Sequence, residues 1–114
     1  MDAHEVIDLY VSPMVVGTEA KLANRLDSAV ASIRSSEALK RRIVGLMGWC
    51  ANAGIFIGRL DQKPVITISF SALTGQLVII PLDIPIPVGQ EVTFAALSTS
   101  GTGYGALAVL VRHD

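Results

Sequence analysis

Hydrophobic and polar residues alternate near the start of this chain. Between residues 5 and 11, the apolar residues Ile7, Leu9 and Val11 are separated by polar or aromatic ones. A period of two places alternate side chains on opposite faces of an extended chain and is typical of a half-buried β-strand. We therefore expect a strand over residues 5–11.

The hydrophobic period changes after this strand. Apolar residues then recur every three or four positions, at Leu22, Leu26, Ala29, Val30 and Ile33. This spacing is typical of an amphipathic helix, and Thr18 is a suitable N-cap. We predict an amphipathic helix over residues 18–34, inside a helical insertion at about 18–43. One helix or two can fill that insertion.

The rest of the chain contains short runs of β-forming residues separated by Gly, Pro, Asn or Ser. These runs cover residues 43–50, 54–60, 64–72, 76–82, 90–98 and 105–112. Many short strands with turn residues between them suit a sandwich or jelly roll. We predict a mainly β fold, a jelly-roll-like antiparallel β-sandwich with one N-terminal amphipathic helix. We expect a single domain over residues 1–114, with the first strand joining the sheet formed by the later ones.

Three prolines stand close together in the second half of the chain. Because proline has no backbone N–H, this segment suits an edge strand or an extended crossing, and neither a central strand nor a helix. We predict that the segment contacts other subunits. The candidate contact residues are Pro81, Ile84, Pro85, Ile86 and Pro87, together with Tyr104 in a glycine-rich loop.

The composition favours self-association. Of the 114 residues, 51% are hydrophobic and 17% are charged, against about a quarter charged in an average soluble domain. A small domain with so few charges is expected to cover part of its surface with copies of itself. We therefore predict a homo-oligomer. The net charge of −1 gives no strong signal for a nucleic-acid partner.

Few residues suggest catalysis. Cys50 lies in an apolar run, and no serine occupies a Gly-x-Ser-x-Gly elbow. The glycine-rich run 101–105 precedes a predicted strand, whereas a phosphate-binding loop precedes a helix. We predict that the chain is not an enzyme and has no catalytic residue and no cofactor.

The two histidines and the one basic cluster each have two interpretations. His4 and His113 lie near opposite termini, where they form either a two-histidine metal site or two solvated ends. We assign no metal. The cluster 40–42 is basic, and Glu37 stands at the spacing of helical ion pairs before it. A solvated or interface surface is one interpretation of this cluster, and contact with phosphate is the other.

Three features of the second half carry a resemblance. They are the short apolar run 54–58, the proline-rich segment 81–90, and the strand pair 92–97 and 106–111 joined by a Ser/Thr/Gly loop. Over residues 54–112 the chain resembles small jelly-roll structural proteins of bacteriophage and related virions. The resemblance implies a non-enzymatic virion component, in the capsid, in decoration or in attachment. It also implies that the chain associates with copies of itself, as a trimer or larger assembly, and with other virion proteins.

Two other functions compete with that of a virion component. One alternative is a carbohydrate- or receptor-binding β-sandwich that uses the 98–105 loop, and another is an enzyme whose site forms between subunits.

The first residues lack the basic and apolar regions of a signal peptide, and no apolar run reaches the roughly 20 residues of a membrane span. We expect a location in the virion or otherwise in the cytoplasm, with no signal peptide and no membrane span.

Overall fold

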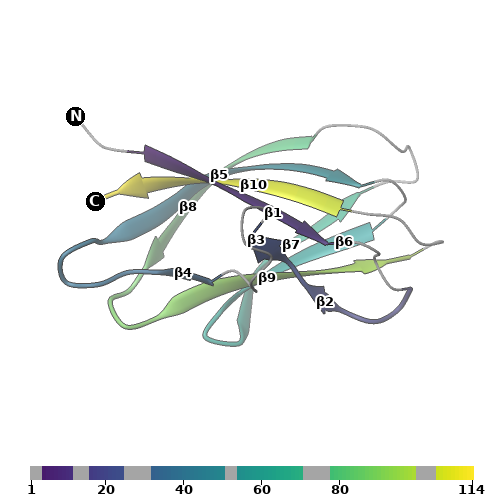
Figure 1. Cartoon of the computed structure of the whole chain (residues 1–114), viewed down its shortest axis with the longest axis horizontal. Helices are drawn as coiled ribbons and strands as arrows, with labels where there is room; N and C mark the ends of the chain where they lie inside the picture. Colours follow the sequence, from purple (N-terminus) through teal and green to yellow (C-terminus); the bar gives the residue numbers. More distant parts are fainter. Residues whose placement is uncertain (1–3, 12–15, 25–31, 51–53, 71–77, 100–104) are drawn as a thin grey trace.

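The structure is a computed structural model that describes residues 4–11, 16–24, 32–50, 54–70, 78–99 and 105–114 (Figure 1). Most of these residues form β-strands. These residues contain no helix. The strands are β1 (His4–Val11), β2 (Ala20–Lys21), β3 (Ala23–Asn24), β4 (Ser32–Arg34), β5 (Arg41–Cys50), β6 (Gly54–Leu60), β7 (Lys63–Phe70), β8 (Val78–Ile86), β9 (Glu91–Ser98) and β10 (Gly105–His113).

The strands form two antiparallel sheets that pack as a sandwich. The first sheet has the order β3-β1-β10-β5-β8, and the second has the order β2-β9-β6-β7, with β4 also paired to β9. The predicted joining of the first strand to the later ones is confirmed, because β1 pairs along its whole length with β10, from His4 opposite Arg112 to Val11 opposite Gly105. The mainly β sandwich is therefore confirmed.

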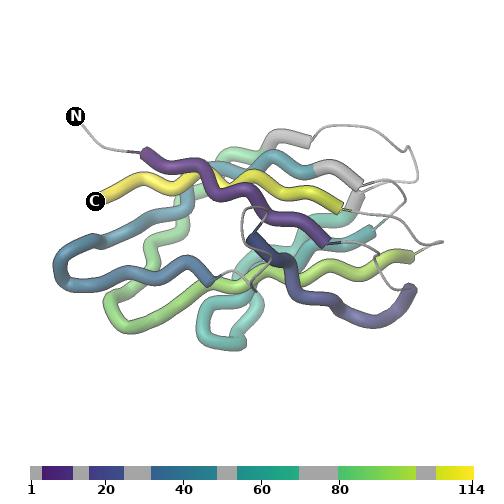
Figure 2. The backbone as a smooth tube through the Cα atoms, in the orientation of Figure 1, coloured from purple at the N-terminus to yellow at the C-terminus, as the bar shows by residue number. Residues whose placement is uncertain are grey.

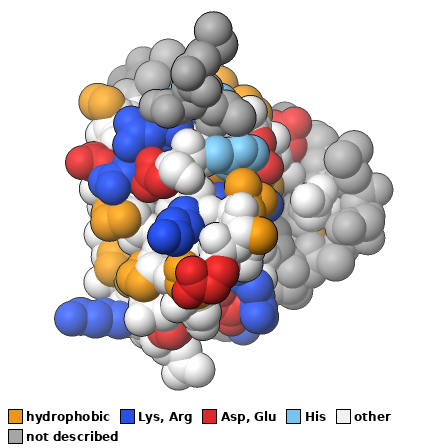
Figure 3. Space-filling view, turned by 90° about the vertical axis from the view of Figure 1, so that its left-hand side faces the viewer, with side chains coloured by type: hydrophobic (Ala, Val, Ile, Leu, Met, Phe, Trp, Pro, Cys, Tyr) orange, Lys and Arg blue, Asp and Glu red, His pale blue; other side chains and the backbone are white. Residues whose placement is uncertain are grey.

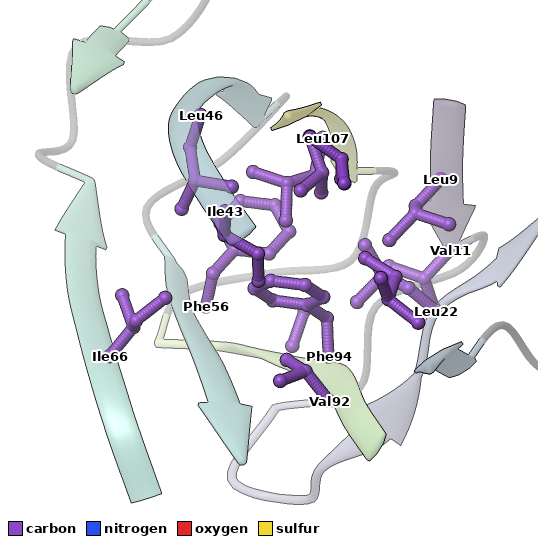
Figure 4. Packing of buried hydrophobic residues seen from close by; sticks show 14 of the residues in the cluster. Leu9, Val11, Leu22, Ile43, Leu46, Phe56, Ile66, Val92, Phe94 and Leu107 are labelled. Atoms are coloured by element: carbon purple, nitrogen blue, oxygen red, sulfur yellow. The ribbon is translucent and has the colours of Figure 1, made fainter. Parts of the chain in front are cut away.

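The hydrophobic core lies between the two sheets. Alternate residues of β1 and β10 are buried, among them Leu9, Leu107 and Val109, as the two-residue period predicts. Phe56 and Phe94 extend from the second sheet into the middle of this layer, where side chains of both sheets meet (Figure 4). The core is thus made by the inward halves of strands whose sequences alternate.

The predicted helix over residues 18–34 is not found in the described part of that segment. Residues 18–24 and 32–34 are extended, and residues 25–31 lie outside the described part of the chain. β2 belongs to the second sheet and β3 to the first, so the chain crosses between sheets at Leu22. This residue is fully buried, and its N–H donates to the carbonyl oxygen of Phe94 at 2.9 Å.

Pairing with β9 explains why residues with helical spacing form extended segments. Leu22 and Ile33 are both buried, but they come from separate short extended segments that pair with β9. Ser32 and Arg34 on either side of Ile33 are exposed, which is the alternation of a strand. Pairing with β9 satisfies the backbone groups of both segments, so tertiary contacts override the local periodicity.

His4, the first described residue, pairs with Arg112, so both ends of the described chain lie at one end of the sandwich. Figure 2 shows the turn between β4 and β5 and the turn between β8 and β9 at this same end. Ser35 forms an isolated bridge with Val88, and Gly89 N–H donates to the carbonyl oxygen of Ser35 at 3.3 Å. Strand β8, which contains Pro81 and Pro85, is the edge of the first sheet. The prediction of an edge strand for this proline-rich segment is therefore confirmed.

Candidate functional site

The outer face of the first sheet is unusually apolar. An antiparallel sheet with one solvated face normally places polar residues outward. Here the outward positions of three adjacent strands include Val6 (61% exposed), Met47 (43%) and Leu110 (38%). Water therefore contacts large apolar side chains in the middle of this face.

A groove runs along this face beside Gly45. Gly45 lies between Leu110 of β10 and Pro81 of β8, and it has no side chain to fill the space between them. The register of β5 shifts between Ile43 and Gly45 against both neighbours, and such a bulge bends a strand. The groove has a volume of about 450 Å³ and is lined by Val6, Val44, Gly45, Leu46, Met47, Ile80, Pro81, Ala108 and Leu110.

This lining decides what the groove can do. It contains neither a titratable side chain nor one that hydrogen-bonds. Such a surface binds by burying apolar area and offers no group for acid, base or nucleophilic chemistry. The sequence carried a signal for it, because residues 43–50 are almost continuously apolar, a pattern typical of a strand covered on both faces.

Charged residues of both signs gather at the end of the sandwich where β1 begins and β10 ends (Figure 3). Arg42 Nη1 lies 2.6 Å from Asp83 Oδ1, and Arg42 Nε lies 3.1 Å from Asp114 Oδ2. Arg112 reaches Asp114 Oδ1 at 3.1 Å. Arg42 and Arg112 are opposite each other in the ladder, so both lie on the same outer face as the groove.

These contacts shift two ionisation equilibria. The hydrogen bond to Asp83, followed by that to Asp114, raises the pKa of the Arg42 guanidinium. Desolvation raises the pKa of Asp114, but hydrogen bonds from Arg112 and Arg42 outweigh it and hold that pKa below its ordinary value. Both shifts favour the charged forms of Arg42 and Asp114.

The basic cluster 40–42 lies in an extended segment, and the expected helical ion pairs with Glu37 are not formed. Arg41 and Arg42 belong to β5 and pair with residues far away in the sequence. Arg41 Nε lies 2.8 Å from Glu5 Oε1, although the two atoms are not aligned for a hydrogen bond. Its Nη1 donates to the carbonyl oxygen of Arg34 at 2.7 Å.

The two histidines lie on adjacent strands but on opposite faces of the sheet. His4 is opposite Arg112, so His113 is one position further along and points to the other face. His113 Nε2 lies 3.5 Å from Glu5 Oε2. The two rings are therefore not brought together. In the described part of the chain, no three His, Cys, Asp or Glu side chains are placed to hold a metal ion.

The predicted contact residues fall into three groups. Pro81, Pro85 and Pro87 are exposed, and Pro81 lines the groove. Ile84 and Ile86 point inward, where Ile86 is 4% exposed and Ile84 packs against the core. Tyr104 lies outside the described residues, as does most of the loop that contains it. A role in subunit contacts remains a prediction for all six residues.

A second, polar hollow lies beside the turn between β6 and β7. It has a volume of about 380 Å³ and is lined by Lys21, Asp61, Gln62, Glu91 and Thr93. Asp61 and Glu91 are tied together, since Asp61 N–H donates to the carbonyl oxygen of Glu91 and Asp61 Oδ1 accepts from Glu91 N–H. Glu91 also pairs with Arg34 at 2.7 Å. Most of the charges here are already partnered within the chain.

Comparison with known proteins identifies the fold. No protein family matches the chain, and no curated protein matches it either. Several solved structures share its fold. The PRD1 vertex protein P5 superposes with a TM-score of 0.56 at 8% identity, covering 95% of this chain and 72% of that protein. The virion resemblance of the sequence is thus confirmed at the level of the fold.

Two further structures have the same fold. Bacillus endospore appendages, described as a novel family of disulfide-linked pili, give a TM-score of 0.53 at 11% identity, covering 99% of this chain and 89% of that one. The CBM36-1 domain of a multidomain xylanase from the hindgut metagenome of Trinervitermes trinervoides gives 0.50 at 6% identity, covering 98% and 97%. The fold therefore occurs in a vertex protein, a pilus protein and a xylanase domain. No helix among the described residues is long and apolar enough to cross a membrane.

Proposed function

We propose that this chain is a non-enzymatic structural subunit of a virion that assembles with copies of itself through the apolar outer face of the first sheet. The observation that carries the proposal is the groove at Gly45, which Val6, Met47 and Leu110 surround with exposed apolar side chains. Burying such a surface contributes roughly 25 cal/mol of favourable free energy for each Å² of apolar area removed from water. A contact with another subunit would remove these apolar side chains from water and would therefore stabilise the assembly.

The charges at one end of the sandwich favour a copy of the same chain as the occupant. They include both Arg42 and Arg112 and both Asp83 and Asp114. A copy related by a half-turn can therefore place opposite charges across the contact, which is the self-complementarity that a two-fold interface requires. With a net charge of −1, two copies also repel each other little at long range.

The fold likeness supports an assembling role. A vertex protein and a pilus protein share this sandwich, and both names denote parts of larger assemblies. The low proportion of charged residues, 17%, favours self-association. The resemblance of the sequence to jelly-roll virion proteins favours a trimer or larger assembly that includes other virion proteins. On this proposal the protein is located in the virion.

Charge insertion at the outer face tests the proposal. Leu110→Glu and Met47→Glu place a carboxylate in the contact and should lower the molar mass measured by light scattering. Val16→Glu is the matched control, because Val16 is 52% exposed and does not line the groove. A mass that falls for both groove variants but not for the control supports the proposal. Unchanged masses for folded Leu110→Glu and Met47→Glu would contradict it.

A second candidate function is binding of a carbohydrate or receptor. The polar hollow at Asp61 and Thr93 favours it, because its side chains offer both donors and acceptors to hydroxyl groups. The CBM36-1 domain of a xylanase shares the fold. Screening glycans with the wild type, Asp61→Ala and Tyr104→Ala distinguishes the hollow from the 98–105 loop. Absence of saturable binding by the wild type would exclude the glycans screened.

A further inference from the structure

Strand β7 forms an open edge of the second sheet. It pairs with β6 on one side, and no described residue pairs with its other side. Its central residues, Val65 to Ser69, are uncharged and mostly β-branched. An unpaired strand of this kind is a template for pairing with another chain.

The pairing pattern identifies which backbone groups of β7 face outward. The carbonyl oxygen of Phe94 accepts from Leu22 N–H, so the backbone groups of Phe94 point away from β6. Gly58, opposite Phe94, therefore directs its own groups toward β7 and toward Ile66. Because the direction alternates along an antiparallel strand, Thr67 and Ser69 direct their N–H and C=O groups to the open edge.

The other long edge of the sandwich, strand β8, is protected against pairing with another chain. Strand β8 carries Pro81 and Pro85, which have no N–H to donate. At the opposite edges of the two sheets, β3 and β2 are each two residues long. Proline occurs in β7 only at Pro64, before its β-branched centre. Among the described edges, β7 is therefore the one suited to adding a strand.

We propose that β7 pairs antiparallel with β7 of a second copy of this chain, about a two-fold axis at Ile68. This arrangement places Thr67 of each copy opposite Ser69 of the other, so the outward N–H and C=O groups of both residues are satisfied. It also places Ile68 opposite Ile68 on the inner face, where the first copy already packs this side chain against its core. Along β7 the charged residue is Lys63, five positions from Ile68, so no charge of this strand lies at the axis.

This second contact determines the form of the assembly. The inference rests on the proposed function in one respect, namely that the partner is a copy of the chain. The outer face and the β7 edge are different surfaces, and each forms a two-fold contact with itself. A subunit with two such contacts joins two neighbours and builds an extended assembly, whereas one contact closes as a dimer.

Three substitutions of Thr67 test the edge contact. Thr67→Pro removes an outward N–H without removing a hydrogen bond to β6, and Thr67→Val is its matched control because it keeps that N–H. Should Thr67→Pro fail to fold, Thr67→Lys adds an edge charge that opposes pairing and leaves the fold intact. We expect the proline or lysine variant to reduce the assembly to a dimer held by the outer faces, and the valine variant to retain the wild-type mass.

Combination with the groove variant separates the two proposals. We expect Leu110→Glu alone to leave a dimer held by β7, and Leu110→Glu with Thr67→Pro or Thr67→Lys to give a monomer. If Thr67 variants lower the mass and Leu110→Glu does not, the edge contact stands and the outer-face contact is wrong. If folded Thr67→Pro and Thr67→Lys keep the wild-type mass, or if the wild type is itself a monomer, the edge contact is wrong.

Discussion

Leu110 of β10 lies opposite Gly45 of β5, so a branched apolar side chain stands beside a position with no side chain. A Cβ atom added at Gly45 would lie 3.6 Å from the carbonyl oxygen of Ile80 and 3.8 Å from Cβ of Leu110, which is ordinary van der Waals contact. The groove therefore exists because a side chain is missing, and the backbone does not require glycine for space there.

Gly45→Ala should consequently stabilise the folded chain. Alanine fits without a clash and reduces the conformational freedom of the unfolded chain, which contributes about 0.4–1 kcal/mol. Urea unfolding monitored at equal protein concentrations measures the change. A large loss of stability would show that Gly45 is needed for the local backbone conformation.

Gly58→Ala should have the opposite effect. A Cβ atom there would lie 2.9 Å from Cε1 of Phe94, and this ring is 2% exposed within the core. The ring has to move against packed neighbours, which costs about 1–3 kcal/mol. The same urea experiment gives the comparison, and equal effects at Gly45 and Gly58 would contradict the packing described around Phe94.

Gln62→Gly should stabilise the hairpin between β6 and β7. Asp61 and Gln62 have φ angles of 48° and 73°, and Leu60 pairs with Lys63 across this two-residue loop. Both central residues of such a turn need positive φ, which glycine adopts without strain. Relief of strain exceeds the added chain entropy of glycine by about 0.5–1 kcal/mol. An unchanged or lower unfolding midpoint for Gln62→Gly would contradict this geometry.

Leu22→Ala should strongly destabilise the chain. Leu22 is fully buried where the chain crosses between the sheets, so truncation leaves a cavity and costs about 2–5 kcal/mol. Lys21→Ala is the control, because Lys21 is exposed and its truncation should change stability by less than about 0.5 kcal/mol. Similar effects for the two variants would be inconsistent with the crossing at Leu22.

The contact between Glu19 and Arg59 should make stability depend on acid pH. Arg59 donates two hydrogen bonds to the Glu19 carboxylate, at 2.7 and 2.8 Å. These bonds lower the pKa of Glu19 in the folded chain. The stabilisation is therefore present above the unfolded-state pKa and lost as the pH falls through the folded-state pKa.

Glu19→Gln removes the ionisable group and is the variant to compare. The difference in melting temperature between wild type and Glu19→Gln should shrink as the solution is acidified. The difference should also be small and decrease with salt, because both side chains are partly exposed to water. A difference that is independent of pH would show that the contact contributes by packing alone.

The sequence predicted the strands better than the connections between them. Ile7, Leu9 and Val11 alternate with polar or aromatic residues and form the inner face of β1, since burial on one side of a sheet imposes that period. The prolines of β8 marked an edge because they lack N–H groups. These features are local, and the residues that carry them are neighbours in the sequence.

What the sequence did not predict depends on contacts between distant residues. Leu22 and Ile33 have helical spacing, yet each is extended because β9 offers backbone partners. The groove arises only when Gly45 is placed between Pro81 and Leu110 from two other strands. Strand order and register decide both outcomes, and periodicity along the chain does not contain that information.

The molar mass of the wild-type protein in solution, followed by light scattering over a dilution series, tests self-assembly before any variant is made. The chain mass is 12.0 kDa. An apolar outer face and an open β7 edge predict a mass greater than that of a dimer, which decreases on dilution. A mass equal to one chain at every concentration would contradict assembly through either surface.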